Sequence, residues 1–136
     1  MAQELVAALI IKEGRVLLVH NRKHALVRIE PPGGKIHANE SHIESLEREV
    51  YEELGVMVGN FRFFGTYRTD SPEGEFPVHI YLCDITSGEP EVREPEKVPA
   101  FGWYTLEEIY RLKDESTLVP NMVEALEDLE GYLESL

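Results

Sequence analysis

The sequence predicts an α/β or α+β sandwich, in which helices pack against a β-sheet. Short apolar segments separated by turn residues indicate strands. Amphipathic segments with capping residues indicate one helix in the first half of the chain and two near its end. This mixed order is typical of layered folds that contain both kinds of element. The length fits one domain, residues 1–136, and we find no internal repeat or linker.

The first predicted elements form a β-hairpin. Residues 6–11 and 15–20 are mostly apolar, and turn residues at 12–14 separate them. A third short strand is predicted at 25–29. It ends at residues 31–34, Pro-Pro-Gly-Gly, which predict a shaped loop because proline lacks an N–H and glycine permits close backbone approach.

The clearest helix signal covers residues 42–54. Ser41 is the expected N-cap, Glu44 completes a capping box, and Gly55 follows the last turn as a terminator. The apolar positions recur at three- and four-residue spacing and predict one buried face: Ile43, Leu46, Val50 and Leu54.

The second half of the chain is expected to add two strands and two helices. Residues 61–68 and 78–84 are rich in strand-favouring residues. Thr105 and Glu108 form another capping-box pattern, and a last amphipathic helix starts at Pro120.

Charge and composition narrow the function classes. A formal net charge of −13 disfavours binding to polymeric nucleic acid, although cations held by carboxylates would still allow a small phosphorylated ligand. No segment reaches the roughly 20 apolar residues of a membrane span. The N-terminal segment lacks the features of a secretory signal, and the single Cys83 excludes an internal disulfide. We therefore expect a cytoplasmic protein without membrane insertion.

Three glutamates on the first predicted helix form a candidate metal site. Glu49, Glu52 and Glu53 fall within an arc of about 100°, beside the apolar face. Carboxylates suit Mg²⁺, which prefers oxygen ligands, and Arg48 could relieve their mutual repulsion. By themselves, three helical glutamates are more often a solvated acidic face. The residues around them decide between the two interpretations.

The run from Gly34 to Val56 resembles the Nudix box, the 23-residue motif of the Nudix hydrolases. All of the defined positions match: Gly34, Glu40, Arg48, Glu49, Val50, Glu52, Glu53, Gly55 and Val56. A weaker resemblance includes the preceding hairpin and the region from Trp103 to the last helix. The resemblance implies a Nudix-type α/β/α sandwich with a mixed β-sheet, and hydrolysis of a pyrophosphate bond by water.

The resemblance also implies a cofactor and roles for individual residues. One to three Mg²⁺ ions, with Mn²⁺ as a substitute, would neutralise phosphate oxygens. Glu52 and Glu53 would be metal ligands, and Glu49 either a further ligand or the general base. The Gly33 carbonyl would be another ligand. Gly34 would let the loop approach the helix and the metal without a side-chain clash, and it is counted with the substrate-binding residues.

Several other residues belong to the predicted site. Arg48 is counted with the catalytic residues, and Glu40 and Gly55 with the structural support. Glu96 is a weaker candidate for an extra metal ligand. Basic residues could contact phosphates, with Lys35 and Arg28 as the main candidates beside Arg22 and Lys23. The five histidines show no zinc-ligand spacing, and the aromatics Phe101 and Trp103 are expected to be core residues rather than base-stacking ones.

The expected substrate is a small nucleotide. The segment from Glu94 to Val98, followed by Trp103, resembles family members that cleave unmodified or oxidised nucleoside triphosphates to a monophosphate and pyrophosphate. Pro72 lies 16 residues after Val56, as a proline does in the ADP-ribose-cleaving subgroup, but it also fits an ordinary turn. Dinucleoside polyphosphates rank third, because the tyrosine of that subgroup is absent from residues 72–74.

Two other functions, neither of them hydrolysis, stay open as interpretations of the sequence. One is a noncatalytic nucleotide sensor, against which the intact Glu49, Glu52 and Glu53 argue. The other is an isomerase on a related scaffold, but Cys83 lies in a predicted strand and is expected to be a packing residue. Many relatives form homodimers, and no residue here identifies such an interface.

Overall fold

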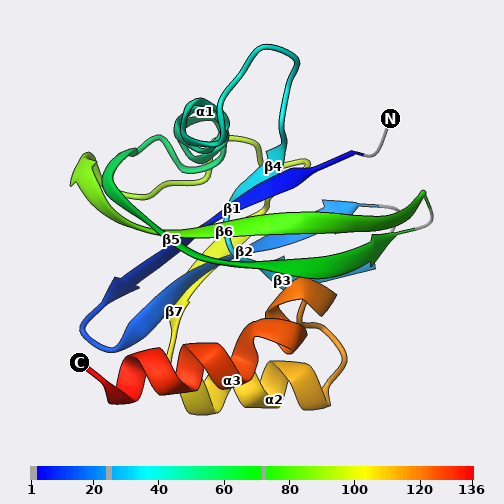
Figure 1. The fold of residues 1–136 in the computed structure, drawn as a ribbon, viewed down its shortest axis with the longest axis vertical. Coiled ribbons are helices and arrows are strands. Elements are labelled where there is room, and N and C mark those ends of the chain that lie inside the picture. The colour runs from blue at the N-terminus through cyan, green and yellow to red at the C-terminus, as the bar shows by residue number, and fades with distance from the viewer. Residues whose placement is uncertain (1–2, 24–25, 72) are drawn as a thin grey trace.

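Strands from both halves of the chain form one mixed sheet, with helices on its two faces (Figure 1). The computed structural model describes residues 3–23, 26–71 and 73–136. The strands are β1 (Leu5–Lys12), β2 (Arg15–Lys23), β3 (Leu26–Glu30), β4 (Gly33–Lys35), β5 (Met57–Ser71), β6 (Gly74–Ser87) and β7 (Ala100–Tyr104). The helices are α1 (His42–Leu54), α2 (Leu106–Asp114) and α3 (Pro120–Glu134).

The sheet is mixed because its central pair is parallel. The strand order is β3-β2-β1-β6-β5, with β4 also paired to β1 and β7 to β2. Strands β1 and β6 run parallel, and the other pairs are antiparallel. The predicted layered fold with a mixed sheet is therefore confirmed.

Alternate residues of β1 face two separate cores. Val6, Ala8 and Ile10 pack with three buried residues of α1: Leu46, Val50 and Leu54. Ala7 and Leu9 pack on the other face, with buried residues of the C-terminal helices: Ile109, Met122, Ala125, Leu126 and Leu129. Helix α1 thus covers one face, and α2 and α3 cover the other (Figure 1).

Local capping fixes the predicted ends of α1. The Glu44 N–H donates to the Ser41 hydroxyl at 3.1 Å, and the Ser41 N–H donates to the Glu44 carboxylate at 2.9 Å. Gly55 adopts a left-handed φ of 70° and ends the helix. Thr105 and Glu108 form the same reciprocal bonds at the start of α2. The helices therefore begin where their capping residues predict.

Strands β4, β5 and β6 differ from the sequence-based expectation, as does β7. Residues 33–35 form the short strand β4 instead of only a loop, because Gly33 fits against the Val6 carbonyl, which a Cβ would strike. Strands β5 and β6 extend beyond the predicted 61–68 and 78–84, since their antiparallel pairing continues to Ser71 and Gly74 at the hairpin end and to Met57 and Ser87 at the other end. Ala25, where the third strand was expected to begin, lies outside the described residues.

Strand β7 was not predicted as a strand. Its five residues are all half-buried, so they lack the alternation that identifies a strand in sequence. They pair with β2, and Phe101 and Trp103 pack against the core beneath α1. The two aromatics are therefore half-buried side chains at the border of this core.

Candidate active site

The three glutamates of α1 lie along one edge of the helix, above β4. Glu53 is fully buried and Glu49 is 7% exposed. The Glu52 side chain is 44% exposed, so exposure to solvent increases from Glu53 through Glu49 to Glu52. The amphipathic pattern of α1 produces this gradient, because the edge of a buried helical face passes gradually into solvent.

Glu53 is a buried carboxylate with one free oxygen. Its Oε1 accepts a hydrogen bond from the Gly33 N–H at 3.0 Å, which holds the Gly33 backbone against the carboxylate. Its Oε2 is buried and has no hydrogen-bond partner within the described ranges. Burial raises the pKa of Glu53 well above its usual value, and the neighbouring carboxylates of Glu30 and Glu49 add to this effect. A cation at this position would relieve both the burial and the repulsion.

Arg48 joins the glycine-rich loop to the carboxylates. Its guanidinium makes two bonds to Glu40, Nε to Oε2 at 2.8 Å and Nη2 to Oε1 at 3.0 Å. Its Nη1 donates to Oε1 of both Glu49 and Glu52 at 2.9 Å. Nη2 also donates to the Lys35 carbonyl at 3.2 Å. One planar side chain therefore sets the position of the loop and of two glutamates.

Glu40 is held as an anion at the base of this network. The Arg48 guanidinium lowers the pKa of Glu40 to about 2, and hydrogen bonds from the Ser45 hydroxyl and the His37 N–H act in the same direction. Glu40 thus braces Arg48 rather than facing the cavity.

The three α1 glutamates are neighbours, but their carboxylates point to two different donors. Glu49 and Glu52 turn to Arg48, whereas Glu53 turns to the Gly33 N–H. No three His, Cys, Asp or Glu side chains in the described part of the chain converge tightly enough to enclose an ion. In this arrangement Arg48 is the hydrogen-bond donor to Glu49 and Glu52, and the Gly33 N–H is the donor to Glu53.

Gly34 is required by its distance from Glu49. A Cβ on Gly34 would lie 2.5 Å from Cδ of Glu49 and 2.6 and 2.7 Å from its two oxygens. Any larger residue would displace the carboxylate. The structure thus gives a steric reason for glycine at this position.

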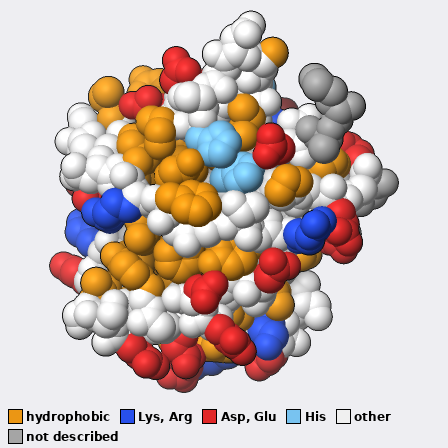
Figure 2. All heavy atoms as spheres, viewed as in Figure 1, with side chains coloured by type: hydrophobic (Ala, Val, Ile, Leu, Met, Phe, Trp, Pro, Cys, Tyr) orange, Lys and Arg blue, Asp and Glu red, His pale blue; other side chains and the backbone are white. Residues whose placement is uncertain are grey.

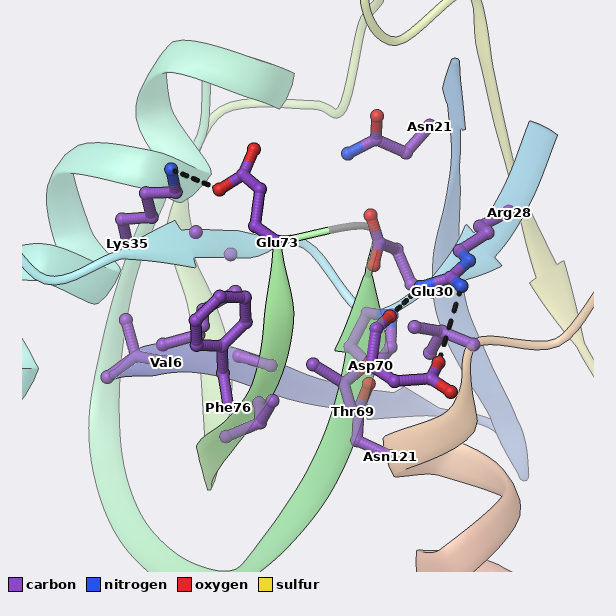
Figure 3. Close-up of a pocket in the computed structure, with 17 residues that line it drawn as sticks. Val6, Asn21, Arg28, Glu30, Lys35, Thr69, Asp70, Glu73, Phe76 and Asn121 are labelled. Atoms are coloured by element: carbon purple, nitrogen blue, oxygen red, sulfur yellow. Dashed lines mark hydrogen bonds and ion pairs between the residues drawn. The ribbon is translucent and has the colours of Figure 1, made fainter. Parts of the chain in front are cut away.

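A cavity of about 330 Å³ opens from the loop beside these glutamates (Figure 3). Gly33, Gly34 and Lys35 form its edge next to α1. Lys35 and Arg28 line this cavity, each within ion-pair distance of a carboxylate of the β5–β6 hairpin, Glu73 and Asp70 respectively. Lys35 Nζ lies 3.7 Å from Glu73 Oε2, and Arg28 Nη1 donates to the Asp70 carbonyl at 2.6 Å.

Other residues singled out from the sequence lie apart from this network. Glu96 is exposed, and no hydrogen bond or ion pair within the described ranges joins it to the α1 glutamates. Arg22 is exposed. The Lys23 side chain and Pro72 lie outside what the structure describes. Cys83 is buried in β6, and burial raises the pKa of its thiol to about 12, which fits packing and not nucleophilic chemistry.

Sequence reasoning did not identify four residues of the cavity. Glu30 lies close enough to Glu53 to raise its pKa, and Asn21, Thr69 and Asn121 line the cavity as buried polar residues. Their positions in strands and at a helix start look ordinary in sequence. Only a polar residue in an inward-facing strand position, as at Asn21 and Thr69, could have served as a signal.

The family assignment rests on nearly the whole chain. A family model described as the NUDIX domain matches residues 1–129. The chain belongs to the Nudix family. Nudix hydrolases cleave phosphorus anhydrides and generally use divalent metal ions. The resemblance inferred from the motif is thereby confirmed.

Two curated Nudix relatives differ in how much of their length is matched. The chain is 30% identical over 127 residues to the NAD-capped RNA hydrolase NudC of Mannheimia succiniciproducens, covering 85% of this chain. It spans 45% of the length of that relative. It is 31% identical over 114 residues to the putative 8-oxo-dGTP diphosphatase 2 of Mycobacterium tuberculosis, covering 81% of this chain and 79% of that protein.

Solved Nudix structures share the fold. A Nudix hydrolase from Nitrosomonas europaea superposes with a TM-score of 0.82 at 21% identity, covering 96% of this chain and 90% of that one. At that identity the likeness concerns the fold alone. Within the described residues, no helix is both long and apolar enough to cross a membrane.

Proposed function

We propose that this Nudix domain, as a single catalytic unit, hydrolyses a nucleoside triphosphate, unmodified or oxidised, to a nucleoside monophosphate and pyrophosphate with Mg²⁺. The observation that carries the proposal is the buried Glu53 carboxylate, which has one unpartnered oxygen beside Gly33 at the edge of the cavity. Such a group is costly without a counter-charge. A metal-dependent phosphate site at the cavity edge would supply that charge.

The residues present fit a hard divalent cation. Glu53 Oε2, the Gly33 carbonyl, Glu49 and Glu52 form an all-oxygen donor set of the kind that Mg²⁺ and Mn²⁺ accept. When bound, the ion would supply charge neutralisation for the phosphate oxygens. Glu49 acts either as a further ligand or as the base for the attacking water, and Glu96 is retained as a weaker ligand candidate.

The remaining site residues position the substrate and the carboxylates. Arg48 is a positioning residue, because it holds Glu49, Glu52 and the loop carbonyl of Lys35 at once. Gly34 leaves room above Glu49. Lys35 and Arg28 would exchange their carboxylate partners for phosphate oxygens when substrate binds.

The relatives of matching length favour a triphosphate. The 8-oxo-dGTP diphosphatase is matched over most of its own length, whereas the NAD-capped RNA hydrolase is matched over less than half. The net charge of −13 also opposes binding of an RNA chain. A cytosolic location and a homodimer remain predictions.

The first test is a hydrolysis panel with resolved products. It contains unmodified and oxidised nucleoside triphosphates, ADP-ribose, a dinucleoside polyphosphate and an NAD-capped RNA, each with Mg²⁺, with Mn²⁺ and with a chelator. Glu52→Gln is the inactive variant. Glu47→Gln is the matched control, since Glu47 is an exposed glutamate of the same helix outside the network. We expect pyrophosphate from a triphosphate, lost with the chelator and in Glu52→Gln only.

The other outcomes identify the alternatives. AMP from ADP-ribose with no triphosphate cleavage would replace the proposal with ADP-ribose hydrolysis. Cleavage of the NAD-capped RNA and of no other substrate would assign this protein to the NAD-capped RNA hydrolases. Metal and nucleotide binding without turnover of any substrate would identify a sensor.

A further inference from the structure

The β5–β6 hairpin places two carboxylates beside the cationic side chains of the cavity. Arg28 and Lys35 are the cations among the described residues that line it. Lys35 Nζ lies 3.7 Å from Glu73 Oε2, and Arg28 Nη2 lies 3.5 Å from Asp70 Oδ1. Figure 3 shows both contacts, which join the hairpin to β3 and β4. Each cation of the cavity therefore already has an anionic partner.

Carboxylates also outnumber the cations in the cavity lining. Glu30, Asp70 and Glu73 belong to the lining, together with Arg28 and Lys35. A polyphosphate that enters this space must take the cations from the hairpin carboxylates. Carboxylate and phosphate oxygens accept the same charge-assisted hydrogen bonds, so the two groups compete for one donor. The hairpin acids are thus competitors of any phosphorylated ligand.

The two ion pairs are weak enough to be exchanged. The Lys35 and Glu73 side chains are 49% and 55% exposed, and those of Arg28 and Asp70 are 36% and 66% exposed. Both separations are longer than a direct charge-assisted hydrogen bond. Exposed pairs of this kind contribute little to stability. They can therefore separate when a phosphate group binds and form again when it leaves.

Arg28 and Lys35 differ in how they are attached to the hairpin. Arg28 Nη1 also donates to the backbone carbonyl of Asp70 at 2.6 Å, a bond that does not depend on the Asp70 side chain. The ion pair of Lys35 with the hairpin is made through the Glu73 carboxylate. Removing the charge of Glu73 should therefore free a cation more completely than removing that of Asp70.

We propose that Glu73, with Asp70 in a smaller role, sets the affinity of the site for phosphate groups by competing with them for Lys35 and Arg28. Binding of the substrate separates the two ion pairs, and their re-formation favours release of the phosphorylated products. The hairpin acids thus limit product inhibition and take no part in the chemical step. The inference rests on the proposed function, because that function assigns phosphate binding to Arg28 and Lys35.

Glu73→Gln removes the competing charge and keeps the size of the side chain. We expect KM for the best triphosphate of the hydrolysis panel to fall roughly 2- to 5-fold and inhibition by pyrophosphate to strengthen by a similar factor, with kcat changed much less. Asp70→Asn should have a smaller effect, because the carbonyl bond to Arg28 remains. Glu75→Gln is the matched control, since Glu75 lies on the same hairpin and pairs with Arg68 at 3.2 Å.

A double-mutant cycle separates competition for Lys35 from a general change in charge. In the Lys35→Met background, Glu73→Gln should no longer lower KM, because no ammonium group is left to free. High salt should also reduce the effect of Glu73→Gln, since it screens exposed charges. The inference is wrong if Glu73→Gln lowers KM equally in the Lys35→Met background, or no more than Glu75→Gln does.

Calorimetry with imidodiphosphate, an uncleaved analogue of pyrophosphate, tests the inference without turnover. With Mg²⁺ present, Glu73→Gln should bind it roughly 2- to 5-fold more tightly than the parent chain, and Lys35→Met should abolish this gain. If no triphosphate is cleaved but the gain is found, the proposed function fails and the inference stands. If triphosphates are cleaved but neither KM nor imidodiphosphate binding responds to Glu73→Gln, the inference is wrong and the function stands.

Discussion

Helices α1 and α3 cover opposite faces of the same sheet but bury different kinds of residue. Each places leucines in a core: Leu46 and Leu54 for α1, Leu126 and Leu129 for α3. Helix α1 also buries the carboxylates of Glu49 and Glu53, whereas α3 keeps its acidic residues outside its core face. Figure 2 shows acidic side chains gathered at the edge of the molecule that α2 and α3 occupy.

Buried carboxylates are thus found on α1, whereas the buried residues of α3 are uncharged. Burying a carboxylate costs free energy, so α1 is less stable than its apolar face alone would make it. Helix α3 buries no carboxylate and has no such cost. The Tyr67 hydroxyl of β5 donates a hydrogen bond to the Asp128 carboxylate of α3 at 2.7 Å, which links the helix to the sheet. Substitutions in the two helices should therefore affect different properties.

The largest effect is expected from Glu53→Gln in α1. Removing this ligand should lower kcat by roughly 10³-fold, because several kcal/mol of transition-state stabilisation depend on the ion. The free energy of unfolding, measured in urea with a chelator, should rise, since a buried charge is replaced by a neutral amide. A variant that loses activity and stability together would show that Glu53 is mainly structural. Glu47→Gln serves again as the control.

The next effect is expected from Leu129→Ala in α3. Leu129 is fully buried, so the cavity left behind should lower the free energy of unfolding by about 3 kcal/mol. The kcat of the folded protein should stay close to that of the parent chain at low temperature. Val123→Ala on the same helix, where Val123 is 37% exposed, should cost much less. A large fall in kcat for folded Leu129→Ala would contradict the separation of roles.

Alanine substitutions of Gly33 and Gly34 should separate an effect on catalysis from an effect on stability within one loop. Gly34→Ala should lower kcat roughly 10- to 100-fold with little loss of stability, because the new Cβ displaces only the end of the Glu49 side chain. Gly33→Ala should instead lower the free energy of unfolding, since its Cβ strikes the Val6 backbone. Kinetics and urea unfolding of both variants check this. Equal loss of stability in the two would mean that Gly34 is also structural.

The smallest effect concerns the pH dependence of stability at the start of α1. The His42 ring stacks on His79 at 4.4 Å, with Tyr81 and Glu4 nearby, and Figure 2 shows histidines together on this face. Burial, followed by the charge of His79, lowers the pKa of His42 below the ordinary histidine value of 6.5, although the charge of Glu4 opposes this.

The sign of this effect follows from the folded state's preference for neutral His42. The contribution of His42 to the free energy of unfolding is fully present above pH 6.5. It is lost as the pH falls through the lowered pKa of His42. Urea unfolding between pH 5 and 7.5 should show a weaker pH dependence in His42→Gln than in the parent chain. An unchanged pH dependence would exclude a contribution from His42.

The features predicted correctly from sequence are those that neighbouring residues determine. The bounds of α1 follow from Ser41, Glu44 and Gly55, which act on their own helix. The Nudix box likewise includes α1, the helix that carries the candidate site. Strands β4 and β7 were missed because their pairing partners, β1 and β2, lie far away in the sequence.

In the candidate site, too, features set by neighbouring residues were predictable and features set by distant contacts were not. The position of Glu53 on its helix was predictable, but its bond to the Gly33 N–H was not, because it depends on how the loop packs on the helix. Asn21 and Thr69 line one cavity because β2, β5 and α3 pack around it. No local pattern records that arrangement.

The parallel pairing of β1 and β6 also constrains how the chain folds. The β1–β2 hairpin is local and can form early, but the other side of β1 requires residues 78–83, which follow far later in the chain. During synthesis on the ribosome, this edge of β1 is open until β6 has emerged. The same apolar strand that supplies both cores is then the segment most exposed to pairing with another chain. We therefore expect residues 5–12 to be a site of pairing between incomplete chains until the β1–β6 pair closes.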